Sequence, residues 1–152
     1  MPNEGRKILC LGCGALNRVP ADKSLEHAKC GRCSARLATP EPVDVTGSQL
    51  AALLSKDTGA RLLDIWAPWC GPCRMMAPHY EAAASSLQGQ VRFFKLNSDQ
   101  EQSAAAQFNI RGVPTLIGWD EGRQVVSQPG AQTGPALEAW IRNVFRLNSS
   151  AN

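Results

Sequence analysis

Six cysteines are the residues of this 152-residue chain whose types and spacing could do chemistry. They form three Cys-x-x-Cys pairs, which are Cys10/Cys13, Cys30/Cys33 and Cys70/Cys73. Two cysteines separated by two residues can close a disulfide ring or clamp a metal ion, and the surrounding residues decide between the two. In a reducing compartment this pattern indicates metal-binding and catalytic thiols, whereas a secreted chain would use it as a disulfide framework. We expect this protein to lie in a reducing compartment, with metal-binding and catalytic thiols.

The surroundings of Cys70 and Cys73 favour redox chemistry. An apolar, strand-like run leads in, and Cys70 falls where a helix would start, because Pro72 suits a first helical turn. A thiol at that place faces unpaired backbone N–H groups and the positive end of the helix dipole, which stabilise its thiolate. We therefore expect Cys70 to be the nucleophile. A third metal knuckle is the alternative, but no fourth pair exists to complete it.

The other four cysteines have the spacing of one closed metal site. Sixteen residues separate Cys13 from Cys30, within the C-x₂-C-x₁₅₋₂₀-C-x₂-C pattern of structural zinc. A segment of this size cannot bury enough apolar surface to fold alone, so the metal should supply much of its stability. We expect one zinc ion, with iron as the alternative that spacing cannot separate. His27 is interpreted as a surface residue.

Composition predicts one ordinary domain with a small appendage, since 43% of residues are apolar and 19% are charged. Two prolines in Thr39-Pro40-Glu41-Pro42 favour an extended spacer. We expect a metal-binding module at 1–39, a linker at 40–45 and a second domain at 46–152. No apolar run is long enough to span a membrane or to serve as a signal segment, so we expect a cytoplasmic location.

The positive charge is concentrated in the metal module. Residues 1–39 carry seven Lys/Arg against three Asp/Glu, in a chain whose net charge is +3. A basic module can indicate nucleic-acid binding, but four metal-bound thiolates would offset much of this excess. We favour charges that solvate the module and balance its metal centre.

The second domain alternates helical and strand-like segments. Helices are expected from Thr46 to before Gly59, over 70–87, over 101–108 and over 137–145, and strands over 61–67, 91–96, 114–119 and 123–127. Asp120-Glu121-Gly122 is expected to form a hairpin turn with a bulge. This order predicts an α/β domain whose mixed central sheet carries helices on both faces.

Four motifs give the domain a family resemblance. These are Trp69-Cys-Gly-Pro-Cys73 following Asp64-Ile-Trp-Ala-Pro, then Lys95-Leu-Asn, Arg111-Gly-Val-Pro-Thr115 and Gly130. Residues 46 to 147 thereby resemble the thioredoxin family. With the four-cysteine module in front, the whole chain is similar to the bacterial thioredoxin 2 type. The resemblance implies a thioredoxin fold preceded by a zinc-ribbon-like module.

The resemblance also implies how the two sulfurs divide their work. Cys70 attacks a substrate disulfide and Cys73 resolves the mixed disulfide. Asp64 is an acid amid apolar neighbours, where ionisation is costly, and the family uses a matching acid as the base for the resolving thiol. Lys95 matches its charge partner. An edge-strand Asp facing water and a solvated Lys95 are the alternatives.

A substrate-binding rim follows from the same resemblance. Its members would be Trp69, Gly71, Pro72, Val113, Pro114 and Gly130, with a cis peptide bond before Pro114. Trp69 as a core residue is the alternative. Gly71-Pro72 between the cysteines is typical of reducing members, whereas oxidants and isomerases usually carry a histidine there.

These observations predict a protein-disulfide reductase. It would act on disulfide-containing proteins, be recharged by an NADPH-dependent thioredoxin reductase, bind no organic cofactor and be a monomer. The alternative is a redox- or zinc-responsive chaperone or regulatory module, in which oxidation of the four-cysteine site releases the metal.

Overall fold

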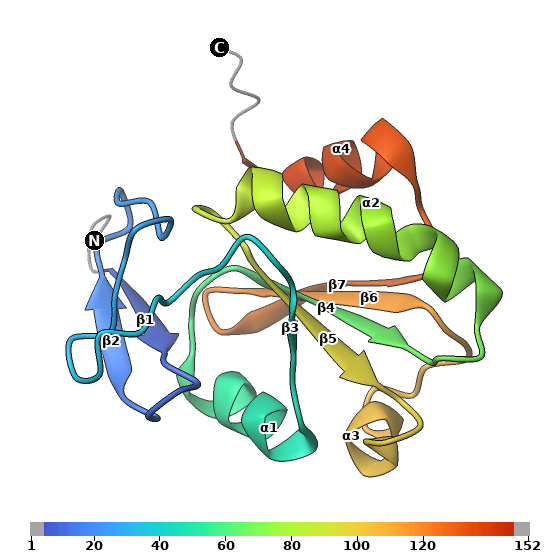
Figure 1. Cartoon of the computed structure of the whole chain (residues 1–152), viewed down its shortest axis with the longest axis horizontal. Coiled ribbons are helices and arrows are strands. Elements are labelled where there is room, and N and C mark those ends of the chain that lie inside the picture. The colour runs from blue at the N-terminus through green and yellow to red at the C-terminus, as the bar shows by residue number, and fades with distance from the viewer. Residues whose placement is uncertain (1–4, 148–152) are drawn as a thin grey trace.

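The computed structural model describes residues 5–147, which form two sheets (Figure 1). The smaller sheet is an antiparallel hairpin of β1 (Arg6–Leu9) and β2 (Leu16–Val19) in the four-cysteine module. Its side chains join a small core of apolar residues and cysteines around Ile8 and Leu37. None of the helices in the described part of the chain is long and apolar enough to cross a membrane.

The larger sheet is mixed, as the sequence predicts. Its strands are β3 (Val43–Asp44), β4 (Arg61–Trp66), β5 (Arg92–Asn97), β6 (Thr115–Asp120) and β7 (Arg123–Pro129). They lie in the order β3-β5-β4-β6-β7. β3 and β4 run parallel to β5, whereas β6 is antiparallel to both β4 and β7. β3 lies within the expected linker at 40–45. It was not predicted, because two residues are too few to show the alternating pattern of a strand.

Four helices cover both faces of this sheet (Figure 1). They are α1 (Gly47–Lys56), α2 (Gly71–Leu87), α3 (Gln102–Ala106) and α4 (Gly134–Val144). Thr46 and Gln49 form a reciprocal capping box that starts α1. α1 and α3 pack on one face, and α2 and α4 on the other.

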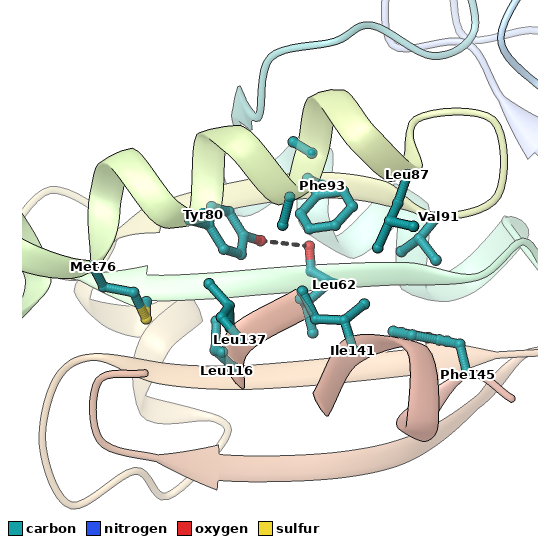
Figure 2. Packing of buried hydrophobic residues seen from close by; sticks show 12 residues of the cluster. Leu62, Met76, Tyr80, Leu87, Val91, Phe93, Leu116, Leu137, Ile141 and Phe145 are labelled. Atoms are coloured by element: carbon teal, nitrogen blue, oxygen red, sulfur yellow. Dashed lines mark hydrogen bonds between the residues drawn. The ribbon is translucent and has the colours of Figure 1, made fainter. Parts of the chain in front are cut away.

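The core on the α2 face positions α2, the helix that begins between Cys70 and Cys73 (Figure 2). Tyr80 of α2 is fully buried, and its hydroxyl donates to Phe94 O at 2.8 Å and lies 3.2 Å from Leu62 O. These carbonyls belong to β5 and β4, so one side chain ties the helix to both central strands.

The hairpin of β6 and β7 differs slightly from the expectation. Glu121 and Gly122 both have positive φ angles (54° and 79°), as a two-residue turn of this kind requires. The irregularity in pairing lies further along, between Gly118 and Trp119, because the strand register shifts there.

The four-cysteine module and the Cys70 end of the domain lie at opposite ends of the central strands (Figure 1). The module contacts Arg92 where β5 begins, whereas α2 starts beyond the end of β4. Six strand residues span about 20 Å. The sheet therefore connects the module to the dithiol.

Candidate functional site

Cys70 and Cys73 lie at the start of α2 and are joined by a disulfide, with a Cα–Cα distance of 5.3 Å. Cys70 is the N-cap residue, and its Sγ accepts a hydrogen bond from Cys73 N at 3.1 Å. Both side chains are nearly buried, with 4% and 3% exposure. The helix start therefore directs a backbone N–H group at Cys70 Sγ, an arrangement that favours a thiolate once the bond is reduced.

The loop before β6 lies against the dithiol. The Val113–Pro114 peptide bond is cis, as the sequence resemblance implies. Val113 O is 3.5 Å from Cys70 Sγ, and the Val113 side chain packs against the two cysteines. Pro114 O accepts a hydrogen bond from Gly130 N at 2.9 Å, so the Gly130 loop is fixed beside it.

Trp69 lies at the surface next to the dithiol and is 68% exposed, which excludes a core role. Its Nε1 donates to Asp99 Oδ1 at 3.2 Å. Gly71 is half-buried and Pro72 is exposed in the first turn of α2. Apolar surface from these residues is thus available around Cys70.

Asp64 lies in the middle of β4 and is 1% exposed, which excludes an edge position facing water. Burial raises the pKa of Asp64 to about 7, and Lys95 acts in the opposite direction. Its Oδ1 has no hydrogen-bond partner among residues 5–147. The pKa of Tyr80 in α2 is raised mainly by its own burial and secondly by the charge of Asp64.

Lys95 pairs with Asp64 in the register of β4 and β5. It is half-buried, and its Nζ lies 4.6 Å from the centre of the Trp66 ring. Asp44 of β3 pairs with Lys95 on the other side. A surface cavity of about 410 Å³ is bordered by Asp44, Glu81 and Lys95, so solvent reaches the lysine next to the buried acid.

The remaining four cysteines converge as a second site. Their sulfur atoms all lie within 4.8 Å of one another. Cys10 Sγ is 3.6 Å from Cys33 Sγ, and Cys13 Sγ is 3.6 Å from Cys30 Sγ. A tetrahedral ion with metal–sulfur bonds of about 2.3 Å would separate its ligands by about 3.8 Å. The cluster therefore fits one ion bound by four thiolates.

Two matching turns present these sulfurs. Gly14 N donates to Cys10 O, and Ser34 N donates to Cys30 O in the same way. Gly14 and Ser34 occupy equivalent positions after the second cysteine of each pair, and both have positive φ angles, 81° and 67°. Each Cys-x-x-Cys pair thus forms a knuckle closed by a left-handed residue.

Comparison with known proteins agrees with both sites. Residues 41–143 match the family model described as Thioredoxin, and residues 9–35 match that described as Thioredoxin 2, N-terminal. The chain belongs to the thioredoxin family. Members of this family are thiol–disulfide oxidoreductases, and Cys70-Gly-Pro-Cys73 is the corresponding dithiol here.

Individual thioredoxins cover most of the chain. It is 36% identical over 134 residues to Thioredoxin C-3 of Corynebacterium nephridii, covering 88% of this chain and 92% of that protein. It is 35% identical over 99 residues to a thioredoxin of Pseudomonas aeruginosa, covering 65% and 92%. A mutant thioredoxin from Halobacterium salinarum has a similar structure, with a TM-score of 0.62, 33% identity, and coverage of 71% of this chain and 94% of that one.

The structure places Val113 against Cys70 and Cys73, and it links Pro114 to Gly130 and Asp64 to Lys95. The roles of these residues stay predictions. Two features were missed. One is the hydrogen bond from Trp69 to Asp99. The other is a buried cluster of Asp57, Arg61 and Arg92 next to the metal module. Arg61 and Arg92 lie opposite each other in the strand register, where two like charges destabilise the pair unless a carboxylate offsets them, but this register is not visible in the sequence.

Proposed function

We propose that this thioredoxin is a protein-disulfide reductase in which Cys70 attacks and Cys73 resolves. The observation that carries the proposal is the position of Cys70 as the N-cap of α2, with Cys73 N donating to its sulfur. A thiolate at this position is stabilised, and it lies beside exposed Trp69, which offers a docking surface for protein substrates.

The reaction transfers two electrons to the substrate. The Cys70 thiolate attacks one sulfur of a substrate disulfide, and the other substrate sulfur leaves as a thiolate. The Cys73 thiolate then attacks Cys70 Sγ, which releases the second substrate sulfur and forms the Cys70–Cys73 disulfide. The structure shows the oxidised product of this cycle.

Asp64 would serve as the base that removes the proton from Cys73. A pKa of about 7 allows the carboxylate to accept a proton near neutral pH and to release it again. Lys95, which pairs with Asp64 in register, would stabilise the carboxylate form of this base and borders a cavity open to solvent. Val113, Pro114 and Gly130 would align an extended substrate segment, with Trp69, Gly71 and Pro72 completing the surface.

Cys10, Cys13, Cys30 and Cys33 would hold one zinc ion. Four thiolate ligands complete a tetrahedron, so the ion supplies cohesion to the module and leaves no open position for a substrate. A four-thiolate metal site of this spacing fits a reducing compartment, and we propose a cytoplasmic location.

The test is reduction of insulin disulfides by the full-length, zinc-loaded chain. NADPH with a flavin-dependent thioredoxin reductase, which we propose as the electron donor, should support turnover. A Cys70→Ser variant should be inactive. Absence of turnover by the wild-type chain with reductases from several bacteria, or with dithiothreitol as reductant, would rule the function out.

A further inference from the structure

A buried ion pair of the thioredoxin domain binds the backbone of the four-cysteine module. Asp57 is the C-cap residue of α1, and Arg92 is the first residue of β5. Arg92 Nη1 donates to Asp57 Oδ2 at 2.6 Å, and both side chains are nearly inaccessible, with 6% and 0% exposure. Charges taken this far out of water require close partners.

Both members of the pair hold the backbone of Leu9. Leu9 N donates to Asp57 Oδ2 at 2.8 Å, and Arg92 Nη2 donates to Leu9 O at 2.8 Å. The Leu9 side chain packs in the core between the sheet and α1, around Leu53. Leu9 directly precedes Cys10, so the first ligand of the metal cluster is attached to a residue fixed by the other domain.

Arg92 also reaches the chain that follows the second knuckle. Its Nε donates to Leu37 O at 3.0 Å, four residues after Cys33. Cys10, Leu37 and Arg92 border one small cavity of about 100 Å³. A single guanidinium therefore bridges the segment entering the first knuckle and the segment leaving the second.

The segment before β4 lies along β1. Thr58 N donates to Lys7 O, and Lys7 N donates to Thr58 Oγ1, both at 2.9 Å. Gly59 N and Arg61 Nη1 donate to Asp57 Oδ1, which fixes the carboxylate that binds Leu9. Among residues 5–147, the hydrogen bonds of Arg61 go to Asp57 and Gly59 and none goes to the module.

We propose that Asp57 and Arg92 are positioning residues of the metal site. The inference rests on the proposed zinc site. The thioredoxin domain holds the backbone of Leu9, which precedes Cys10, and of Leu37, which follows Cys33. The four cysteines therefore lose less conformational freedom when they bind the metal ion. Groups that orient metal ligands typically contribute about 10- to 100-fold to metal affinity. By linkage, zinc binding shifts the equilibrium for docking of the module on Asp57 and Arg92 by the same factor.

The experiment measures zinc affinity of the full chain by competition with a chromophoric chelator. Arg92→Lys keeps the charge but cannot bridge Leu9 O and Leu37 O, and Asp57→Asn keeps the side-chain shape. Arg61→Lys is the matched control, because it makes the same change at a buried arginine and keeps a cation that can donate to Asp57, while none of the hydrogen bonds of Arg61 among residues 5–147 reaches the module. We expect R92K and D57N to weaken zinc affinity about 10- to 100-fold and R61K to stay within about threefold.

Thermal unfolding with and without zinc gives an independent readout. Zinc should raise Tm less in R92K than in the wild-type chain. Equal losses of affinity in R92K and R61K, or wild-type affinity in R92K despite a lower Tm, would overturn the inference and leave the zinc site standing. A wild-type chain that binds no zinc would overturn both. If R92K does not fold at 25 °C, D57N decides by the same criteria.

Discussion

Asp64 and Lys95 lie directly opposite each other on the parallel strands β4 and β5, the acid fully buried and the lysine at the edge of a solvent cavity. Burial removes the water that would stabilise the Asp64 carboxylate, and the positive charge of Lys95 partly offsets this lost hydration. As a consequence, the pKa of Asp64 is raised to about 7, close to the pH at which thiol–disulfide exchange takes place.

Replacing Asp64 by Asn should stabilise the oxidised protein in alkaline solution. The pKa of Asp64 is about 7 in the folded protein against 3.8 for an unperturbed group, so the unfolded chain binds fewer protons between these values. The contribution of Asp64 to the free energy of unfolding of the wild-type chain therefore falls by up to about 4 kcal/mol as the pH rises from about 4 to 7. Urea unfolding at pH 4 and pH 8 checks this. A D64N variant no more stable than wild type at pH 8 contradicts the burial argument.

The same D64N variant should resolve mixed disulfides slowly. Because the amide cannot accept a proton from Cys73, we expect a drop of about 10²- to 10⁴-fold at pH 7. Single-turnover release of a peptide from its Cys70 adduct measures the step. An unchanged rate would remove Asp64 from the mechanism.

Lys95→Met should shift the pH dependence of resolution upward. Loss of the cation leaves burial unopposed, so the pKa of Asp64 rises further and more alkali is needed to form its carboxylate. The pH–rate profile of the resolving step measures the shift. Lys56→Met, a change at an exposed lysine in the last turn of α1, is the control and should leave the profile in place.

Asp99→Ala should weaken recognition of protein substrates. The variant loses the hydrogen bond that holds the exposed Trp69 ring, and one such bond contributes about 0.5–1.5 kcal/mol, or about 2- to 10-fold in kcat/KM for insulin. A small aromatic disulfide should be reduced at nearly the wild-type rate. Asp99→Asn keeps an acceptor oxygen and should retain activity; an equal loss in both variants would point away from the hydrogen bond.

Ser34→Gly should strengthen the metal module. Ser34 holds a φ of 67°, where a side chain costs about 1 kcal/mol, whereas Gly14 occupies the equivalent place without that cost. Zinc release to a chelator should be slower from S34G and faster from Gly14→Ala. Gly12→Ala is the control, because Gly12 does not have a positive φ and its added Cβ would make only ordinary contacts.

Local patterns made much of the fold predictable. The apolar run before Cys70 and the face of α4 around Leu137 and Ile141 identify buried elements without tertiary information. β1, β2 and β3 were not predicted, because strands of two to four residues carry too little periodicity. Their pairing depends on contacts distant in sequence.

The two sites were predictable to different degrees. Cysteine spacing and the motifs around Cys70, Asp64 and Pro114 indicated both centres. The Asp57–Arg92 pair was not predicted, since its members are 35 residues apart and only the docking of the module brings them to Leu9. Charged residues at the ends of helices and strands usually face water, so burial had to come from the structure.

Trapping with a Cys73→Ser variant tests the central claim most directly. The reduced, zinc-loaded variant is mixed with oxidised insulin, and the products are digested and analysed by mass spectrometry without reductant. The account predicts one insulin chain attached through Cys70, with Cys10, Cys13, Cys30 and Cys33 unmodified. No adduct, or attachment through the four-cysteine module, would contradict it.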